Sequence, residues 1–307
     1  MPIKVPAKLP AIEALEKENI FVMDKFRAEK QDIRPLRLAI LNLMPDKLTT
    51  ERQLLRLISN TPIQMDVRFL RTGTHESKNT DPAHLKSFYH TFDEVLAKKT
   101  KFDALIVTGA PVERLDFAEV KYWDELSKIF AWAEHNVYSS LYICWAAQAA
   151  LYYYYGINKT EVPAKISGVF EHRVLDSLNP LLRGFDGVFC APHSRYTEVE
   201  RDKMYAHPEL AVLADSSEAG IYLAASKDLR RIFQFGHGEY DAETLHLEYS
   251  RDVQKGLNIA MPKNYYINDK TGELPPIRWR AHESLLISNW LNYCVYQATP
   301  FDIDAIK

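Results

Sequence analysis

The chain has 307 residues, of which 47% are hydrophobic and 26% are charged, and its formal net charge at pH 7 is −3. These values are typical of a globular protein, and nothing in them predicts the strongly basic face that nucleic-acid binding needs. The three cysteines are widely spaced and the histidines form no cluster, so neither a disulfide framework nor a metal site is predicted. The amino terminus lacks the apolar core of a signal peptide and no apolar run could cross a membrane, so we expect a cytoplasmic protein without a membrane partner.

Hydrophobic patterning predicts an N-terminal arm over residues 1–35, followed by a single α/β domain over residues 36–300. In chain order, strands are predicted over 36–43, 65–70, 102–107 and 137–143, and helices over 48–59, 85–97, 119–135 and 145–155. Helices of this length between short strands indicate crossover connections and a parallel sheet. The second half is less regular, with strands predicted over 188–191, 211–214, 220–225 and 231–235, and helices over 241–255 and 282–297.

Cys144 stands where the predicted strand over 137–143 meets the predicted helix over 145–155. Ligands of a parallel sheet gather beyond the carboxyl ends of its strands, and the positive end of a helix dipole favours a thiolate. The small residues Ala146 and Ala147 permit a sharp turn that resembles a nucleophile elbow. We therefore interpret Cys144 as a nucleophile, with the backbone N–H of Trp145 as a candidate oxyanion donor. The alternative is a buried structural cysteine, which is the interpretation we give to Cys190 and Cys294.

A catalytic cysteine needs a proton acceptor, and the acceptor needs a partner that fixes its tautomer. His237 and Glu239 follow the predicted strand over 231–235, at the sheet edge where Cys144 is expected. Their spacing lets both side chains point the same way on extended backbone. We interpret them as base and orienting group. Of the other histidines, His172 and His193 are expected near substrate segments, where they could be orienting groups. His135 and His282 are expected at helix ends.

Seven motifs give the chain a specific family resemblance. They are QDIRPL at 31–36, LNLMPDK at 41–47, TGAPVE at 108–113, YICWAAQA at 142–149, APHSRYTEV at 191–199, GHGEYD at 236–241 and SNWLNYCVYQ at 288–297. With these motifs in this order, the chain resembles the homoserine O-acyltransferases of methionine biosynthesis, which comprise O-succinyltransferases and O-acetyltransferases. The resemblance implies a flavodoxin-like, class I glutamine amidotransferase-like α/β fold, with helices on both faces of a parallel sheet. It also suggests a homodimer.

The resemblance further implies a ping-pong reaction in which Cys144 takes an acyl group from acyl-CoA as a thioester. His237 would then activate the hydroxyl of homoserine, and no cofactor would be needed beyond the acyl-CoA substrate. The substrate-binding residues of the family fall on Lys165, Ser194 and Arg251. Without the resemblance, Lys165 and Arg251 would be interpreted as surface charges.

Two further positions bear on the reaction that the resemblance implies. In the family, glycine at the position of Glu113 accompanies succinyl-CoA and glutamate accompanies acetyl-CoA, so Glu113 predicts acetyl-CoA as donor. A charged glutamate would repel the succinyl carboxylate by about 4 kcal/mol at 4 Å and an effective dielectric constant near 20. The second position departs from the family, which commonly has a proline between the histidine and the glutamate where this chain has Gly238. A glycine there is expected to hold the base less rigidly.

Several other functions remain open from the sequence. Succinyl-CoA could be the donor, or serine the acceptor. A glutaminase-type amidohydrolase on the same fold is a more distant alternative, although no synthetase domain accompanies it. A ligand-binding or chaperone-like protein without catalysis is a further alternative.

Overall fold

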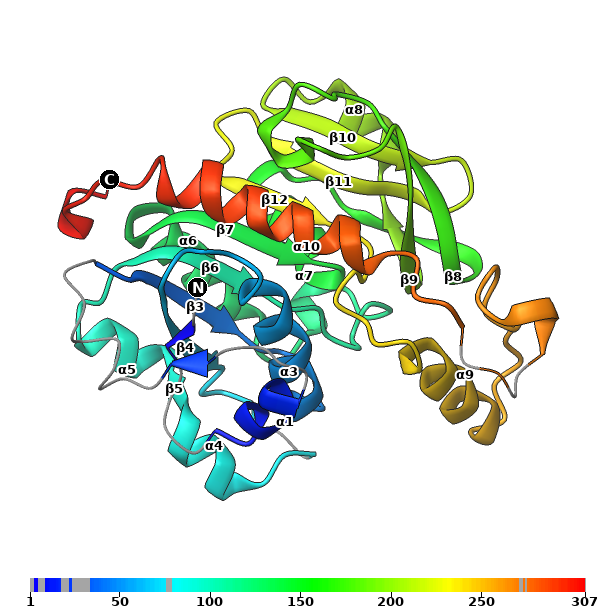
Figure 1. Cartoon of the computed structure of the whole chain (residues 1–307), viewed down its shortest axis with the longest axis horizontal. Helices are drawn as coiled ribbons and strands as arrows, with labels where there is room; N and C mark the ends of the chain where they lie inside the picture. The colour runs from blue at the N-terminus through cyan, green and yellow to red at the C-terminus, as the bar shows by residue number, and fades with distance from the viewer. Residues whose placement is uncertain are drawn as a thin grey trace.

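The computed structural model describes residues 3–4, 9–17, 22–23, 34–75, 79–270, 273 and 275–306. In this part of the chain, 12 strands form one mixed sheet (Figure 1). Their order across the sheet is β2 (Val22–Met23), β1 (Ile3–Lys4), β4 (Met65–Arg71), β3 (Leu36–Leu41), β6 (Phe102–Val107), β7 (Val137–Ile143), β12 (Arg231–Gln234), β11 (Gly220–Ser226), β10 (Leu210–Ser216), β8 (Lys159–Val174) and β9 (Val188–Val199), while β5 (Tyr89–Thr91) pairs with β4. Pairing is parallel from β2 through β12 and antiparallel from β12 to β9.

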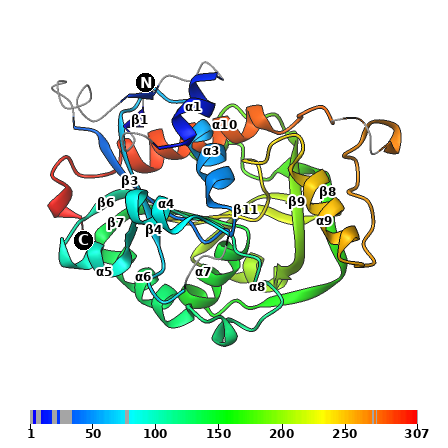
Figure 2. The same cartoon turned by 90° about the horizontal axis from the view of Figure 1, so that it is seen from below.

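Helices cover both faces of the parallel part of the sheet, as predicted (Figure 2). The described helices are α1 (Ala11–Lys17), α3 (Lys47–Ile58), α4 (Pro82–Phe88), α5 (Phe92–Ala97), α6 (Trp123–Asn136), α7 (Trp145–Tyr155), α8 (Arg201–Ala206), α9 (Thr244–Gln254) and α10 (Arg280–Asn289). Shorter helical segments are η1 (Phe117–Glu119), η2 (Pro180–Leu182), η3 (Ile267–Asp269), the π-helical η4 (Trp290–Tyr296) and η5 (Ile303–Ala305). The predicted α/β class is confirmed.

Alternating residues of the central strands build two apolar layers, one on each face of the sheet. On β3, Leu38 and Ile40 share a buried cluster with α3 and α10, whereas Ala39 and Leu41 share another with α6 and α7. Successive side chains of a strand point to opposite faces, so a strand that is covered on both faces is apolar throughout. This is why residues 38–41 form a continuous hydrophobic run.

The described parts of the predicted N-terminal arm contact the domain. β1 pairs with β4, opposite Met65, and Leu9 is buried in the apolar layer on the α3 side. At the end of the segment, Arg34 donates two hydrogen bonds of 2.9 Å to the buried Asp103 on β6. Residues 1–2, 5–8, 18–21 and 24–33 lie outside the described residues. The division into an arm and one domain stays a prediction.

The structure corrects the predicted helix over 85–97, which is two short helices separated by strand β5. The second helix begins anew at Thr91, whose side chain and that of Glu94 form reciprocal hydrogen bonds with the backbone, a capping box. The long strand β8 was not predicted, because its sequence is polar and contains Pro163 and Gly168. β8 and β9 form a long antiparallel hairpin that extends the sheet beyond its parallel part.

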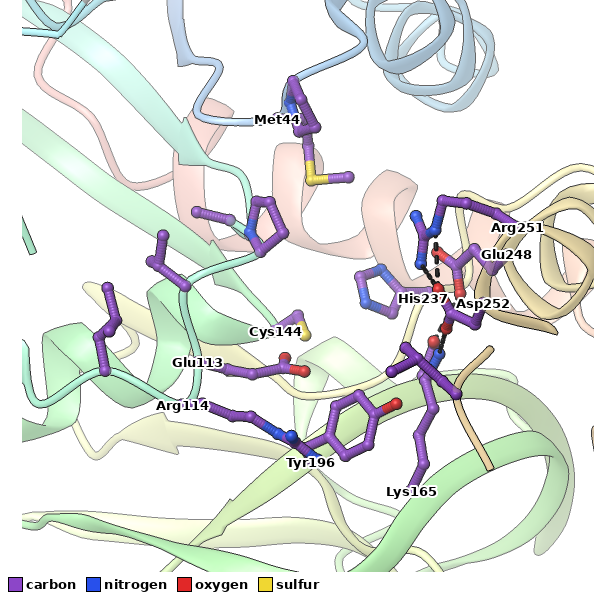
Figure 3. Close-up of a pocket in the computed structure, with 18 of the residues that line it drawn as sticks. Met44, Glu113, Arg114, Cys144, Lys165, Tyr196, His237, Glu248, Arg251 and Asp252 are labelled. Atoms are coloured by element: carbon purple, nitrogen blue, oxygen red, sulfur yellow. Dashed lines mark hydrogen bonds and ion pairs between the residues drawn. The ribbon is translucent and has the colours of Figure 1, made fainter. Parts of the chain in front are cut away.

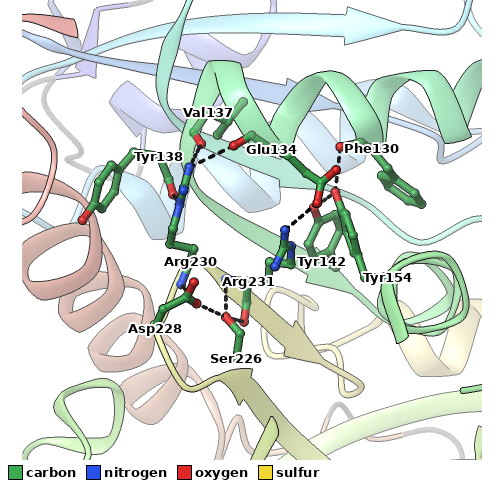
Figure 4. A network of polar contacts seen from close by, with 10 residues as sticks. All are labelled: Phe130, Glu134, Val137, Tyr138, Tyr142, Tyr154, Ser226, Asp228, Arg230 and Arg231. Carbon is green, nitrogen blue, oxygen red and sulfur yellow. Dashed lines mark hydrogen bonds and ion pairs between the residues drawn. The ribbon is translucent and has the colours of Figure 1, made fainter. Parts of the chain in front are cut away.

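A polar network fixes β12 beside β7 at the amino ends of both strands (Figure 4). The Arg230 side chain donates to the backbone carbonyls of Glu134, Val137 and Tyr138, at distances of 3.0–3.1 Å. Arg231 forms an ion pair of 2.9 Å with the Glu134 carboxylate. These bonds tie the end of α6 to the start of β12. The carboxyl end of β12 therefore emerges next to that of β7.

Candidate active site

Cys144 is the single residue between β7 and α7, and its backbone has φ 53° and ψ −115°. Such a conformation costs a non-glycine residue on the order of 1–3 kcal/mol and is held only by its surroundings. The N–H of Cys144 donates to the carbonyl of Gln234 on β12, at 2.7 Å. Gly109, after β6, leaves room on the other side, since a Cβ there would lie 3.3 Å from that of Cys144. This strained turn is the geometry expected for a nucleophile elbow.

His237 follows the carboxyl end of β12 and its ring faces Cys144 across a cavity (Figure 3). Its Nδ1 lies 2.7 Å from Oε1 of Glu239, which leaves Nε2 for the thiol. Both side chains are about nine-tenths buried, at 5% and 9% exposure. Burial disfavours the imidazolium, but the charges of Cys144 and Glu239 and hydrogen bonds to both outweigh it and raise the pKa of His237 well above its usual range. The three residues thus form a thiol–imidazole–carboxylate triad joined by hydrogen bonds.

The backbone around His237 rests on two buried side chains. Tyr222 lies directly beneath Gly236, and the Glu283 carboxylate lies beneath Gly238, where any Cβ would collide with it. The Tyr222 hydroxyl donates to Glu283 at 2.7 Å, which joins the two supports. Burial raises the pKa of Glu283 to about 7. Gly238, where the family commonly has proline, therefore accommodates Glu283, and this carboxylate fills the space that a looser turn would leave open.

Cys144 and His237 both line a cavity of about 520 Å³. Its lining brings together the predicted residues Glu113, Cys144, Lys165, Ser194, His237 and Arg251. Glu239 supports His237 from behind, and Trp145 begins α7, where its N–H has no acceptor within the helix. All residues predicted for the site therefore lie in or against one cavity. Their chemical roles stay predictions.

A charged cluster lines the side of the cavity formed by β8 and α9. Lys165 forms an ion pair of 2.9 Å with Asp252, which Arg251 also contacts at 2.7 Å. Burial opposes the Asp252 carboxylate, but these two cations lower its pKa overall. The Ser194 hydroxyl donates to Glu248 at 2.5 Å. The cluster presents two cations and two carboxylates, which matches the opposite charges of an amino acid.

Sequence reasoning missed Glu248, Asp252 and Tyr240. Tyr240 stacks on the His237 ring with centroids 4.3 Å apart, and its hydroxyl donates to Glu248 at 2.8 Å. One signal could have found the two acids, because residues 248, 251 and 252 share one face of the predicted helix over 241–255. Tyr240 offered no periodic signal.

Glu113 lies on the loop after β6, on the Cys144 side of the cavity (Figure 3). Burial raises its pKa, against the opposing effects of the Tyr196 backbone N–H and of nearby Lys165 and His237. The loop is held by Lys159, whose Nζ donates to the carbonyl oxygens of Glu113 and Leu115, at 2.7 and 2.8 Å. This position therefore disfavours negative charge and is fixed in place.

The histidines 172 and 193 lie outside the cavity lining. Both are fully buried and their Nε2 atoms are 2.9 Å apart. Burial and the neighbouring Arg195 lower the pKa of His172 to about 3, and that of His193 also falls well below its usual value.

The two other cysteines lie outside the cavity lining. Burial raises the pKa of Cys294 to about 12, and burial is also the main cause of the raised pKa of Cys190. Among the described residues, no group of His, Cys, Asp or Glu is arranged to hold a metal ion.

Comparison with known proteins extends these observations. Residues 2–301 match the family described as homoserine O-succinyltransferase. The chain is 57% identical over 307 residues to a homoserine O-acetyltransferase of Acetivibrio thermocellus, and each chain is covered completely. It is 53% identical to the protein of the same name in Bacteroides fragilis, again over all of both chains, and 54% identical to that of Lachnospira eligens over 99% of this chain and 97% of the relative.

Solved structures with low sequence identity share the fold. A glutamine amidotransferase of Thermotoga maritima matches with a TM-score of 0.54 at 12% identity, over 84% of this chain and 98% of that protein. The glutaminase domain of Trypanosoma brucei CTPS matches with a TM-score of 0.50 at 11% identity, over 76% and 98%. The predicted amidotransferase-like fold is thereby confirmed. No described helix is both long and apolar enough to cross a membrane.

The contact between Gly238 and Glu283 predicts a strong coupling between these positions. We expect Gly238→Ala to lower the free energy of unfolding by about 1–3 kcal/mol, because the new methyl group overpacks against the Glu283 carboxylate. Glu283→Ala removes the colliding atoms and should abolish most of this cost, whereas the isosteric Glu283→Gln should not. Urea unfolding of the single and double variants measures the coupling. An equal cost of Gly238→Ala in all three backgrounds contradicts the prediction.

The hydrogen bond between His237 and Glu239 predicts the effect of Glu239→Gln. The pKa of His237 should fall, because the carboxylate that favours the imidazolium is gone. An NMR titration of the His237 ring measures this change, with the exposed Glu209→Gln as control. Turnover should fall on the order of 10⁴-fold through loss of the correct tautomer. An unchanged imidazole titration would show that Glu239 does not act on His237.

Proposed function

The chain belongs to the homoserine O-succinyltransferase family, and from this premise we propose that it is a homoserine O-acetyltransferase that acts through a thioester on Cys144. Its place is in methionine biosynthesis. The observation that carries the mechanism is the single cavity in which Cys144 and His237 face a cluster of paired charges. Acyl transfer needs a nucleophile, a base and a site for the acceptor, and the lining of this cavity offers a candidate for each.

In the first half-reaction, the Cys144 thiolate attacks the carbonyl carbon of the acetyl-CoA thioester. The resulting oxyanion is stabilised by backbone donors at the start of α7, for which the N–H of Trp145 is our candidate. The C–S bond to CoA then breaks, and the proton held by His237 goes to the departing sulfur. The acetyl group stays activated because one thioester has replaced another.

In the second half-reaction, His237 takes the proton of the homoserine hydroxyl while the oxygen attacks the acetyl carbon on Cys144. The C–S bond to Cys144 breaks, and the thiolate is again paired with the His237 imidazolium. Glu239 holds the ring in the required tautomer through its bond to Nδ1. After the second half-reaction, Cys144 is again a thiolate and His237 is again an imidazolium, so the enzyme has returned to its starting state.

The charged cluster supports an amino-acid acceptor. Lys165 and Arg251 suit the α-carboxylate, because both are cations whose present partner is Asp252. Glu248 suits the α-ammonium group, because its oxygens accept from neutral hydroxyls in the free protein. An amino acid would add one charge of each sign to the cluster, so the overall charge balance is kept while Asp252 still lies beside the two cations.

Glu113 supports acetyl-CoA as the donor. A succinyl group would bring a second carboxylate to a position where burial already disfavours one negative charge, as the raised pKa of Glu113 indicates. It would also need the space that the Glu113 side chain occupies. The family name alone does not distinguish the donors, since relatives in the family carry the acetyltransferase name.

The proposal includes a cytoplasmic location and a homodimer. All three cysteines are free thiols, which suits a reducing compartment. The homodimer rests on the family resemblance.

The reaction is tested by offering acetyl-CoA or succinyl-CoA with homoserine or serine and following release of CoA. We expect the highest rate with acetyl-CoA and homoserine, and mass spectrometry should detect an acetyl group on Cys144 when acetyl-CoA is supplied alone. Cys144→Ala, which removes only the sulfur, is the matched control for the adduct. Faster transfer to serine would change the acceptor, and ammonia release from glutamine without acyl transfer would instead support an amidohydrolase.

Substitutions at Glu113 separate charge from size in donor choice. Glu113→Gly should raise the preference for succinyl-CoA over acetyl-CoA by up to about a thousandfold, because both the like charge and the side-chain volume are removed. Glu113→Gln keeps the volume and should recover only part of this change. The ratio of kcat/KM for the two donors is the measurement. A wild-type protein that already prefers succinyl-CoA refutes this role of Glu113.

A further inference from the structure

A second cavity of about 370 Å³ adjoins the active-site cavity at the same edge of the sheet. It lies beyond the carboxyl ends of β3, β4 and β6, where ligands of parallel sheets bind. The two cavities share a wall formed by Met44, Pro45, Pro111, Val112 and Leu115. Figure 3 shows Met44 extending toward the space above Cys144. A long, narrow substrate that reaches Cys144 past this wall would have its far end in the second cavity.

The second cavity is basic. Among its described lining residues there is no Asp or Glu, whereas Lys47, Arg71, His75 and Lys121 all contribute to it. The active-site cavity, in contrast, holds several acids among its lining residues. These acids stand beside the cations Arg114, Lys165 and Arg251, so the active-site cavity is nearly balanced in charge, whereas the second cavity favours an anion.

The basic groups are only partly satisfied by the protein. Nε of Arg71 is buried without a hydrogen-bond partner, while its Nη1 donates to the Thr72 carbonyl at 3.3 Å. The Lys47 Nζ donates to the backbone carbonyls of Asn42 and Met44, at 2.7 and 3.2 Å. Burial lowers the pKa of Lys47 to about 8, an effect that Glu51 opposes and Arg71 reinforces. An anion in the cavity would offset this unfavourable concentration of positive charge.

We propose that this basic cavity binds the phosphate-bearing nucleotide end of the acyl-CoA donor. The inference rests on the proposed function, because it assumes that a CoA thioester delivers the acyl group to Cys144. The pantetheine arm would cross the shared wall beside Met44, whose unbranched thioether side chain adapts readily to a ligand. The phosphates would then meet Arg71 and Lys121 through charge-assisted hydrogen bonds.

The test compares two donors that carry the same acetyl thioester, acetyl-CoA and acetyl-pantetheine, which lacks the nucleotide and its phosphates. Lys121→Glu and Arg71→Gln should each raise the KM for acetyl-CoA by roughly tenfold or more, since each removes a charged hydrogen-bond donor. Neither should change the KM for acetyl-pantetheine or for homoserine. Lys227→Glu, at an exposed turn between β11 and β12, makes the same charge change away from the cavity and should alter none of these values.

An equal effect of Lys121→Glu on both donors, or no effect on either, overturns the proposal. Because Lys121 is exposed, this variant should fold normally even if Arg71→Gln does not. Calorimetric titration with CoA itself keeps the inference separate from the proposed function, because binding is measured without transfer. CoA that binds wild type but binds Lys121→Glu at least severalfold more weakly supports the cavity even if homoserine is not the acceptor. Competition by inorganic phosphate as strong as that by adenosine 3′,5′-bisphosphate would point instead to a simple anion site.

Discussion

The parallel pairing of β7 with β12 is the constraint on which the site depends. The register places Gln234 opposite Ile143, and the next residue, Cys144, donates its N–H to the Gln234 carbonyl at 2.7 Å. A shift of one residue would turn every side chain of β12 to the other face and carry His237 away from the thiol. The network around Arg230 and Arg231 secures this register at the amino ends of the strands, remote from the chemistry. Strain at Cys144 is thereby supported by ordinary sheet hydrogen bonds.

The sequence allowed the parallel half of the fold and the heart of the site to be predicted. Continuous apolar runs mark strands that are covered on both faces of the sheet. Cys144 and His237 each follow such a run, so both could be placed at the carboxyl ends of parallel strands, where ligands bind. Lys165, Ser194, Arg251 and Glu113 were found only through the family resemblance, because polar side chains at these positions look like those of any solvated surface. The placement of Lys165 and Ser194 in this cavity depends on the β8–β9 hairpin, in which β8 gave no strand signal and only residues 188–191 of β9 were predicted.

Other features depend on contacts between distant segments. Glu283 lies on α10, yet its carboxylate occupies the space beneath Gly238, 45 residues earlier in the chain. No local pattern links these two positions, so the glycine alone suggested a looser turn. In the structure, Gly238 packs against Glu283, and this contact holds the backbone that carries His237. A departure from a family pattern can thus be compensated by a side chain from another element.

The pairing of Lys165 and Arg251 with Asp252 gives the acceptor side of the cavity nearly balanced charge before any substrate arrives. A zwitterion adds one charge of each sign and keeps this balance, whereas a simple amine would add a positive charge without its opposite. A plain alcohol would leave the internal pairs as they are and would gain no ion pair. Selection for amino acids would then be a matter of charge balance and would need no dedicated steric filter. Serine and homoserine carry the same charges, so the discrimination between them falls to geometry. The distance from this cluster to the acylated sulfur of Cys144 would then determine which length of acceptor side chain places its hydroxyl at the acetyl carbon.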